Sequence, residues 1–559
     1  MAEYLKLKKA NCKNCYKCIR HCPVKSIQFS GNQAHIISDE CILCGNCFVI
    51  CPQNAKEIVN DVDRCKVLLS DNEEVYATVA PSFIGCYDGV GIQGLEAGLQ
   101  KLGFKGVVET AVGATYVKTQ YEKLVHEGNM DVIISTCCPT VNLLVQKHYP
   151  EALKYLAPVV SPMEAASLDI KKRHPGAKVV FIGPCLSKKD EVDRYPGYAD
   201  LVLTFEELNE WFESASVVLS KETDKTDESK ARLFPTCGGI LKTMALEDKY
   251  TYLAVDGIEN CIACLKDILS ENLTHCFIEM SSCVGSCIGG PVMAKYHSYP
   301  VKSYQEVIRY AGREDFKADL ISDSELVLSR EAIILQSAKK MPTEEEIQEI
   351  FHRMGKNKPE DQLNCGSCGY NSCRDKAIAV FQGKADMTMC LPFLKEKAES
   401  LTSNIIGSTP NGIIVVNEQL EVQLINKAAR EIMNIQNAGD VMGEQVIRIL
   451  DPKPFMDVLS TGRNVKEKKM YLAEYDRYVE MSVVYDRNFH ILMCLMRDVT
   501  SEENAKEEKA KISEETVMVA DKVVDKQMRI VQEIASLLGE TAAETKIALT
   551  KLKESIKNE

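Results

Sequence analysis

The sequence lacks the features that mark secreted, membrane and nucleic-acid-binding proteins. No apolar run in its 559 residues approaches 18, and the first 15 residues contain no hydrophobic signal core. Positive charge is also in deficit, since 67 Lys and Arg face 80 Asp and Glu, which gives a net charge of −13. These absences argue against a membrane span and a nucleic-acid partner. We therefore expect a cytoplasmic protein.

Histidine is scarce, whereas cysteine is abundant. The chain has nine His and 24 Cys, and no His is spaced from the clustered cysteines as in a zinc finger. Cytosolic thiols stay reduced, so a disulfide framework is the weaker interpretation. Thiolate ligands without imidazole favour iron–sulfur clusters over most zinc sites.

Eight cysteines form two copies of one pattern. Cys-x2-Cys-x2-Cys-x3-Cys-Pro begins at Cys12 and recurs at Cys41. Bacterial two-cluster ferredoxins share this doubled spacing pattern, and in them the fourth Cys of each copy is a ligand of the other cluster. The predicted 4Fe–4S ligands are Cys12, Cys15, Cys18 and Cys51 for one cluster, and Cys41, Cys44, Cys47 and Cys22 for its partner. Two zinc sites are the less favoured alternative.

A third group of cysteines follows a change in sequence pattern near residue 340, where a helical pattern with an acidic first turn begins. Its spacing, CGSCGYNSC followed later by CLP, resembles a small single-cluster domain of anaerobic redox proteins. The predicted ligands of this third 4Fe–4S cluster are Cys365, Cys368, Cys373 and Cys390. A zinc knuckle is the alternative. Cys261 and Cys264, by contrast, lie on a helical pattern and are expected to be buried small hydrophobes.

Residues 75 to about 325 alternate short apolar runs with helical patterns, which predicts an α/β domain with a parallel sheet. Three of the apolar runs lead into cysteines, at Cys137 and Cys138, at Cys185, and at Cys283 and Cys287. Ligands gather at the carboxyl ends of parallel strands, so these distant segments are expected to converge.

Together the segments Ser135–Pro139, Gly183–Glu191 and Glu279–Gly290 resemble, in order, the three signature loops of FeFe-hydrogenases. The resemblance implies an H-cluster, which is a 4Fe–4S cubane joined to a diiron subsite carrying CO, cyanide and a bridging azadithiolate. Its implied ligands are Cys138, Cys185, Cys283 and Cys287, with Cys287 bridging to the diiron subsite.

The same resemblance implies roles for residues around the diiron subsite. Cys137 would relay protons, Lys188 would donate to a cyanide ligand, and Glu191 would belong to a proton path. Ala80, Pro81 and Ser82 would pack around the diiron ligands, with Ser82 as a second donor.

Four departures from the family pattern concern the surroundings of the cofactor. Gly183 and Ser281 stand where Met is usual, which predicts a looser or wetter pocket. The third loop ends Gly289-Gly290-Pro291 without the usual Gln, and the helix before Cys137 lacks the paired glutamates of the usual proton path. These departures predict slow turnover with an intact ligand set.

After residue 395 the sequence pattern changes again, and Cys494 is the only cysteine that follows. Residues 396–500 resemble a PAS domain, with a β-hairpin over GIIVVNEQLEVQLIN, a following helix and a closing RDVT. Residues 501–559 show a continuous helical pattern, which predicts a dimerising coiled coil or signalling helix; a helix docked on its own domain is the alternative. The last histidine is His490, so this helix cannot accept a phosphoryl group on histidine.

The expected architecture is multidomain, α/β and α+β. Its parts are a ferredoxin-like domain with two 4Fe–4S clusters (1–65), a two-lobed hydrogenase domain (66–335), a single-cluster domain (336–395), a PAS domain (396–500) and the helix (501–559).

The combination resembles the sensory FeFe-hydrogenases. The implied reaction is the reversible oxidation of H2 to protons and electrons, slow and serving hydrogen or redox sensing. Implied partners are a ferredoxin-like electron carrier, a separate kinase or phosphatase and a second copy of the chain, with no membrane or nucleic acid. A bulk ferredoxin-linked hydrogenase with a dimerising tail and a non-catalytic iron–sulfur scaffold remain alternatives.

Overall fold

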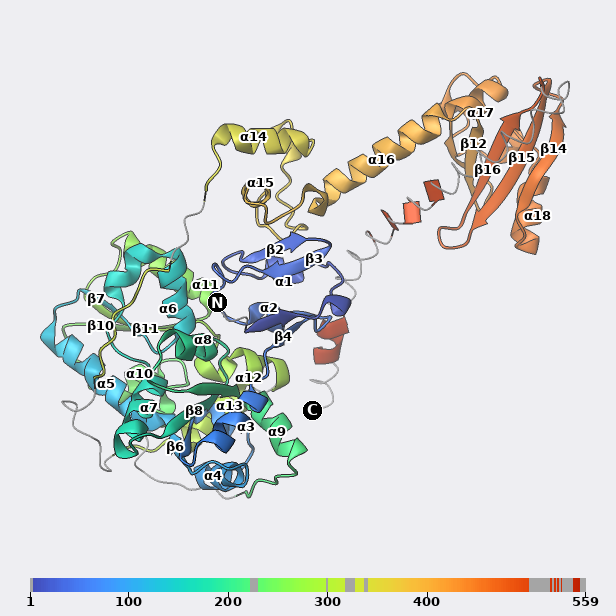
Figure 1. Ribbon diagram of the computed structural model, residues 1–559. Helices are drawn as coiled ribbons and strands as arrows, with labels where there is room; N and C mark the ends of the chain where they lie inside the picture. The colour runs from blue at the N-terminus through green and yellow to red at the C-terminus, as the bar shows by residue number, and fades with distance from the viewer. Residues whose placement is uncertain are drawn as a thin grey trace. The chain divides into compact units, whose positions relative to one another are not determined.

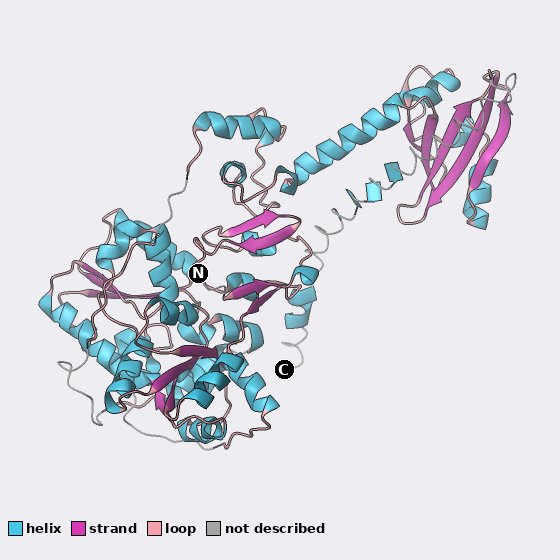
Figure 2. Cartoon of the chain, viewed as in Figure 1, coloured by secondary structure: helices cyan, strands magenta, loops and turns pink. Residues whose placement is uncertain are grey.

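The computed structural model describes residues 4–221, 230–297, 300–316, 327–335 and 340–501, and short helical pieces beyond them, the longest being 546–552. The chain divides into two compact units, Met1–Asp386 and Met387–Glu559 (Figures 1 and 2). Most of the helix predicted over 501–559 lies outside the described residues. No helix in the described part is both long and apolar enough to cross a bilayer.

The N-terminal repeat forms two similar halves. The short helices α1 and α2 each begin within a cysteine loop, after a residue with positive φ, Tyr16 (55°) and Gly45 (74°). Two antiparallel pairs, β1 with β4 and β2 with β3, frame these helices. The elements are β1 (Leu5–Leu7), α1 (Lys17–Arg20), β2 (Ile27–Ser30), β3 (Gln33–Ile36), α2 (Asn46–Val49) and β4 (Lys56–Ile58).

Two parallel sheets organise the central region, and the parallel pairing of their strands is as the sequence predicts. One has the order β6-β5-β8-β9 and the other the order β10-β11-β7. The strands are β5 (Val75–Val79), β6 (Gly106–Glu109), β7 (Val132–Ile134), β8 (Lys178–Gly183), β9 (Leu201–Thr204), β10 (Thr251–Asp256) and β11 (Cys276–Ser281). Strands β5, β7 and β8 are buried along nearly their whole length, which is typical of parallel sheets covered on both faces.

Helices enclose both sheets (Figure 2). They are α3 (Val62–Asp71), α4 (Ile92–Lys101), α5 (Thr110–Glu127), α6 (Pro139–His148), α7 (Pro162–Arg173), α8 (Ser187–Arg194), α9 (Phe205–Ser214), α10 (Gly239–Thr243), α11 (Ile258–Leu269), α12 (Pro291–Tyr296) and α13 (Pro300–Tyr310). Helices α5 and α7 approach closely at Gly113, where an added Cβ would lie 2.1 Å from the Pro162 carbonyl oxygen. Only glycine fits there.

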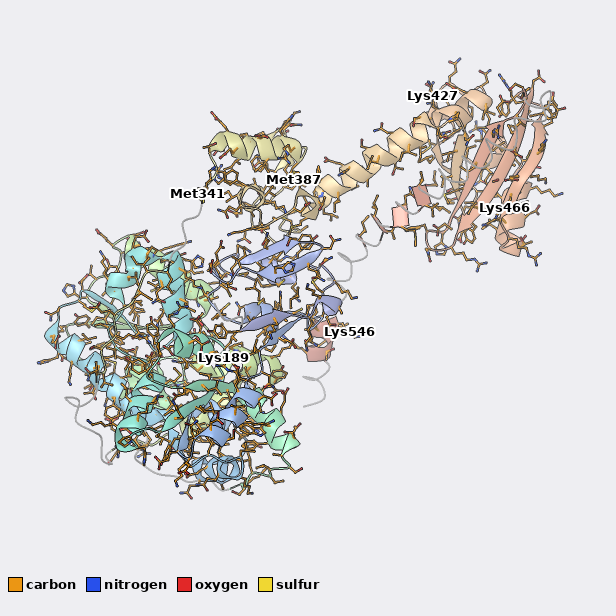
Figure 3. The ribbon with its side chains drawn as sticks, viewed as in Figure 1. Lys189, Met341, Met387, Lys427, Lys466 and Lys546 are labelled. Carbon is orange, nitrogen blue, oxygen red and sulfur yellow. The ribbon has the colours of Figure 1, made fainter. Side chains whose placement is uncertain are left out.

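Helix α3 crosses the domain boundary expected at residue 65. Its Val62 and Cys65 are buried in the core of the β6-β5-β8-β9 sheet, so the helix belongs to the central region. Lys189 (Figure 3) links the segment before α3 to helices α8 and α9 of the central region. Its buried ammonium, on α8, donates to the Val59 carbonyl and to Asp61, just before α3, and to Glu207 of α9. Cys261 and Cys264 are buried in the core around β7 and β11, as predicted.

The third cysteine group begins between two helices, α14 (Glu344–Arg353) and α15 (Cys373–Phe381). Thr343 and Ser372 cap them through reciprocal bonds with Glu346 and Asp375. The helix predicted at MPTEEEIQEIFHRMG is thereby confirmed.

The second unit begins with helix α16 and continues into an antiparallel sheet of order β13-β12-β16-β15-β14. Its elements are α16 (Leu391–Ser408), β12 (Gly412–Asn417), β13 (Val422–Ile425), α17 (Lys427–Ile432), α18 (Lys453–Thr461), β14 (Val465–Leu472), β15 (Arg477–Asp486) and β16 (Ile491–Asp498). The predicted hairpin is β12–β13. Buried Asn426 fixes its base, since it accepts from Ile413 N and Ala429 N and donates to the Ile406 and Asn411 carbonyls. The domain boundary expected at 396 falls inside α16.

Candidate functional site

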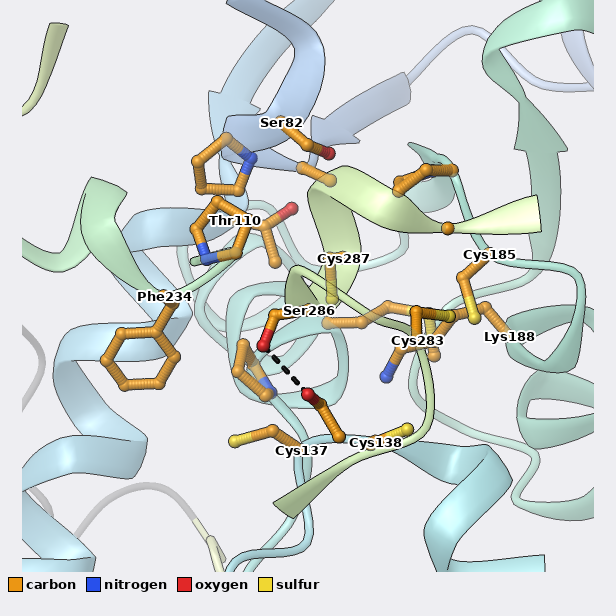
Figure 4. A pocket seen from close by; sticks show the side chains of 18 of the residues that line it. Ser82, Thr110, Cys137, Cys138, Cys185, Lys188, Phe234, Cys283, Ser286 and Cys287 are labelled. Atoms are coloured by element: carbon orange, nitrogen blue, oxygen red, sulfur yellow. Dashed lines mark hydrogen bonds between the residues drawn. The ribbon is translucent and has the colours of Figure 1, made fainter. Parts of the chain in front are cut away.

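Four strand ends meet at one pocket in the central region. β5 leads into Ala80, Pro81 and Ser82, and the other three strands, β7, β8 and β11, lead into the predicted cysteine loops. The pocket has a volume of about 100 Å³ and is lined by Cys137, Cys138, Cys185, Lys188, Cys283 and Cys287 together with Ala80, Pro81 and Ser82. Figure 4 shows these side chains around one space, with Ser82 and Cys137 on opposite sides of it.

The four predicted cubane ligands lie deep in the protein. Cys287 lines the pocket and is the most exposed of the four, whereas the other three are partly buried. Burial raises the pKa of Cys185, Cys283 and Cys287 above the ordinary value. Such thiols ionise only when a strong positive charge, such as iron, lies beside them.

Ser82 shows that the pocket suits a polar ligand. Its hydroxyl is buried, with 1% of the residue exposed, and has no hydrogen-bond partner among the described residues. A buried hydroxyl without a partner is costly. An acceptor in the pocket, such as a cyanide nitrogen, would satisfy it, so the residues present fit the group that the sequence implies.

Lys188 faces the same pocket from helix α8. Its ammonium donates to the hydroxyl of Ser161 at 2.9 Å and to Glu191. An ammonium has three N–H donors, so these two bonds leave one for a group in the pocket. Burial alone would lower the pKa of Lys188, but the Glu191 carboxylate raises it above its ordinary value, and the group is cationic.

Glu191 is held as a counter-ion. Burial alone would raise its pKa, but Lys188 and Arg330, whose guanidinium lies 3.3 Å away, lower it. A carboxylate fixed between two cations is a poor proton carrier near neutral pH. The structure therefore favours an orienting role for Glu191, and its place on a proton path remains a prediction.

Two groups near Cys137 were not predicted. The Tyr121 hydroxyl, on α5, lies 3.3 Å from the Cys137 sulfur and accepts from the Thr136 amide at 2.9 Å. Glu279 accepts from the amide of Leu241 in α10. Burial raises the pKa of Cys137 to about 12, with Tyr121 and Lys188 opposing and the charge of Glu279 adding to the rise. Burial likewise raises the pKa of Glu279 to about 7.

The phenyl ring of Phe181 fills the space beside Gly183. An added Cβ on Gly183 would lie 2.7 Å from the ring of Phe181 and 3.1 Å from Ala80. Ser281 is the second position at which Met is usual in FeFe-hydrogenases. Its hydroxyl forms a hydrogen bond of 2.8 Å with the hydroxyl of Ser286 (Figure 4). The expectation of a looser pocket is thus corrected on the Gly183 side, because an aromatic ring replaces the volume of a methionine.

We expect Gly183→Met alone to overpack this wall and to destabilise the protein by about 1–3 kcal/mol. The double variant Gly183→Met/Phe181→Ala should recover most of that loss, because it removes the clashing ring. Thermal unfolding of both variants measures the effect. Equal stability of Gly183→Met and the parent protein would contradict the assignment of Phe181 as the filler.

The eight N-terminal cysteines face each other in two loops. Backbone amides donate to three of the sulfurs, from Ser26 to Cys22, from Leu43 to Cys41 and from Ala55 to Cys51. Burial raises the pKa of Cys18 to about 12 and that of Cys44 and Cys47 well above normal. In the described residues no three His, Cys, Asp or Glu lie close enough to hold a single metal ion.

Cys365 of the third group differs from these thiols. Burial alone would raise its pKa, but hydrogen bonds from Ser367 lower it, so its thiolate is stabilised. Cys390 lies directly before α16, in the second unit, and its ligand role remains a prediction from spacing.

The sequence matches three known domain families. Residues 73–291 match the iron only hydrogenase large subunit, C-terminal domain; residues 4–52 match a 4Fe–4S dicluster domain; residues 361–392 match a putative Fe–S cluster domain. Iron–sulfur modules therefore flank the hydrogenase-like region on both sides.

Curated relatives include an iron hydrogenase of Clostridium pasteurianum, 23% identical over 41% of this chain and 52% of the relative. A cytosolic Fe–S cluster assembly factor of Encephalitozoon cuniculi is 24% identical over 36% of this chain and 64% of the relative. The chain thus spans between about half and two-thirds of the length of these proteins.

Solved structures similar to parts of the chain include a variant FeFe-hydrogenase from Chlamydomonas reinhardtii, with 16% identity and a TM-score of 0.40 over 50% of this chain and all of that one. The PAS domain of nitrogen regulation protein NR(II) from Vibrio parahaemolyticus has 17% identity and a TM-score of 0.16, over 18% of this chain and 97% of that one. By its matched family and its curated relatives, this chain contains a domain related to the iron-only hydrogenases, accompanied by iron–sulfur modules.

Proposed function

We propose that the chain is an FeFe-hydrogenase that interconverts H2 with protons and electrons slowly and serves as a hydrogen or redox sensor. One observation carries the proposal: the four cysteines, Cys137, Lys188 and the unpartnered Ser82 hydroxyl line one pocket at the ends of four parallel strands. Cys138, Cys185, Cys283 and Cys287 would hold the H-cluster, and the remaining cysteine groups would hold three 4Fe–4S clusters.

Different side chains of the protein would orient the cofactor, exclude water from it and carry its proton. When bound, the diiron subsite would supply the chemistry of H2. Lys188 and Ser82 would orient it by donating hydrogen bonds, and Pro81 and Phe181 would exclude water. The Cys137 thiol would carry the proton between the subsite and the protein interior.

Slow turnover is supported by the groups behind Cys137. Helix α5 presents the buried Tyr121 hydroxyl to the thiol, and tyrosine exchanges a proton near neutral pH less readily than a carboxyl does. Glu279 is the carboxyl whose charge acts on Cys137, and it is 4% exposed. A carboxyl that is buried to this extent exchanges protons with solvent more slowly than an exposed one, and this limits proton flow.

Infrared spectroscopy of the matured protein tests the proposal directly. CO and cyanide stretching bands would demonstrate the diiron subsite, whereas an iron–sulfur scaffold would show none. The scaffold alternative is favoured by one observation, the similarity to an Fe–S cluster assembly factor. A matured protein that contains iron but lacks these bands would establish that alternative.

We expect the rate of H2 oxidation to rise with pH through about 7. Glu279 has a pKa of about 7, so its carboxylate, which can accept the proton, forms as pH rises through that value. Glu279→Gln keeps the acceptor for the Leu241 amide but cannot accept a proton, so the inflection near pH 7 should vanish. An unchanged pH profile in Glu279→Gln would contradict the role.

A stability measurement is the control for that variant. Because the folded-state pKa exceeds the ordinary 4.5, the folded protein binds the extra proton, and stability falls as pH rises from about 4.5 to 7. The penalty above pH 7 is roughly 3 kcal/mol. Glu279→Gln should therefore be no less stable than the parent at pH 8.

A second part of the proposal concerns output through the second unit, which would pass to a separate protein. We propose a kinase or phosphatase partner that reads the PAS-like region and a homodimer joined through the terminal segment. Such a partner must bind the oxidised and reduced states with different affinity, because equal affinity shifts no equilibrium. The bulk-enzyme alternative predicts no redox-dependent partner and a much faster turnover.

Removal of residues 409–559, which leaves α16 whole, is expected to preserve H2 oxidation within about twofold, because the described pocket residues all lie in the first unit. Redox-dependent capture of a partner, measured under H2 and under oxidant with the full chain as bait, should be lost. A partner captured equally in both states, or none, would leave this region only a dimerising role.

A further inference from the structure

Tyr370 of the third cysteine group has a buried hydroxyl that lacks a partner. The residue is 2% exposed, and its hydroxyl makes no hydrogen bond among the described residues. It follows Cys368 by two positions, in the loop that precedes α15. A buried unpaired hydroxyl costs about 1–3 kcal/mol, so a partner absent from the protein itself is indicated.

The loop that carries Tyr370 docks on the first half of the N-terminal repeat. Gly369 has φ of 90°, and an added Cβ would lie 3.0 Å from Ile19. Arg20 donates to the Ser367 carbonyl at 3.2 Å, and Lys25 donates to the Gly369 carbonyl at 3.1 Å. These contacts hold the backbone on either side of Tyr370 against the residues that precede and follow Cys22.

A second set of contacts reaches the other half of the repeat at Glu40, next to Cys41. The buried Lys384 ammonium pairs with the Glu40 carboxylate at 2.6 Å, and the Lys384 carbonyl accepts from the Phe29 amide at 2.8 Å. The charges of Cys368, Cys22 and Glu40 all act on the Tyr370 hydroxyl. Tyr370 therefore stands between Cys368 of the third group and Cys22, which is one of the four predicted ligands in the set Cys22, Cys41, Cys44 and Cys47.

This same set borders the hydrogenase-like pocket. Lys147 of α6, the helix that follows Cys138, donates to the Cys41 carbonyl at 2.7 Å. Cys44 packs in the same apolar core as Cys138. On the other side, an added Cβ at Gly45 would lie 2.5 Å from Pro291, in the turn that follows the Cys287 loop.

We propose that the Tyr370 hydroxyl donates a hydrogen bond to the cluster held by Cys22, Cys41, Cys44 and Cys47, and that the third cluster exchanges single electrons with this cluster directly. In each exchange one cluster loses one electron and the other gains it. The Cys22 cluster is thus a branch point for electron transfer, because it exchanges electrons with both other clusters. The cluster held by Cys12, Cys15, Cys18 and Cys51 is then not on the route between the third cluster and the pocket. The inference rests on the iron–sulfur part of the proposed function and does not need the diiron subsite.

Potentiometric EPR titration with a chemical reductant tests the hydrogen bond. A donor to a cluster sulfur stabilises the reduced, more negative state, so Tyr370→Phe should lower the potential of the Cys22 cluster. The expected change is about tenfold in the ratio of oxidised to reduced cluster, which is 59 mV for a one-electron couple. Tyr87→Phe is the matched control, because Tyr87 is also a buried tyrosine with an unpartnered hydroxyl, but it lies in the central core.

Unchanged potentials in Tyr370→Phe, or equal shifts in both variants, would overturn the hydrogen bond. Iron content and the signals of all three clusters, measured on each variant, show whether the clusters themselves are present. If they are absent from the parent protein, the iron–sulfur assignment of the proposed function fails instead.

The branch is tested by magnetic coupling in the reduced protein. Coupling between the third cluster and the Cys22 cluster should broaden the EPR signal of each, persist in Cys15→Ala and disappear in Cys365→Ala. A signal whose broadening disappears in Cys15→Ala would show that the Cys12 cluster lies between the two and would overturn the branch. Cys44→Ala is a second test, because it removes a ligand of the Cys22 cluster itself. It should also abolish the broadening of the EPR signal of the third cluster.

Discussion

Cys287→Ala is expected to abolish the CO and cyanide infrared bands of the matured protein while leaving the signals of the other three clusters unchanged. Cys287 is the pocket thiol most exposed to the cavity, so it is placed to join the cubane to the diiron subsite. Alanine removes that link without adding volume. The loss should be complete rather than partial, because Cys287 would supply the thiolate that joins the two parts of the cofactor.

The control for this variant is Cys264→Ala. Cys264 is a buried cysteine of the same domain that packs in the core and does not line the pocket. It should keep the bands at full intensity, with a small loss of stability at most. Bands of parent intensity in Cys287→Ala would show that Cys287 is not the bridge. Loss of bands in both variants would show that folding, rather than ligation, is being measured.

The convergence at the pocket was predictable from sequence because parallel strands point their carboxyl ends the same way. Cys138, Cys185 and Cys283 each follow a buried apolar run, and the alternation with helices predicts the sheet. The sequence does not reveal that two separate sheets meet there. Nor does the sequence reveal the close packing of α5 against α7 at the small residues Gly113 and Ala166.

Side-chain contacts that no sequence motif marks account for what was not predicted. Arg330 reaches Glu191 across 139 positions, and this pairing holds the carboxylate as a counter-ion. Phe181 fills the place beside Gly183 because residues two apart on β8 share a face of the strand, a signal that the sequence did contain. Tyr370 was visible as part of CGSCGY, but only the docked loop shows that its hydroxyl is buried.

Tyr121 illustrates how a missing motif can conceal a substitute. The helix before Cys137 lacks the paired glutamates that are usual in FeFe-hydrogenases, and it places the Tyr121 hydroxyl 3.3 Å from the Cys137 sulfur. Tyr121 is fully buried, bonds the Thr136 amide and contacts the Cys137 sulfur. It therefore fixes the position of the thiol, which makes it a positioning residue for the proposed proton transfer.

Cys137→Ala is expected to retain the cofactor bands and to lose about 10²–10⁴-fold in H2 oxidation, the usual effect of removing a positioned acid–base group. Cys137 lines the pocket but is not among the proposed ligands, so its loss should leave the diiron subsite bound. The thiol pKa of about 12 means that it carries its proton at neutral pH and can pass it on only to a group that approaches closely.

Tyr121→Phe separates this proton role from a merely structural one. It keeps the ring packed against Phe277 but removes the hydroxyl beside the thiol, so turnover should fall by about tenfold with bands unchanged. A Cys137→Ala variant that oxidises H2 at the parent rate would end the relay assignment. Equal losses in Cys137→Ala and Tyr121→Phe would instead show that the thiol and the tyrosine hydroxyl act as one unit, because residues that act as a unit have non-additive effects.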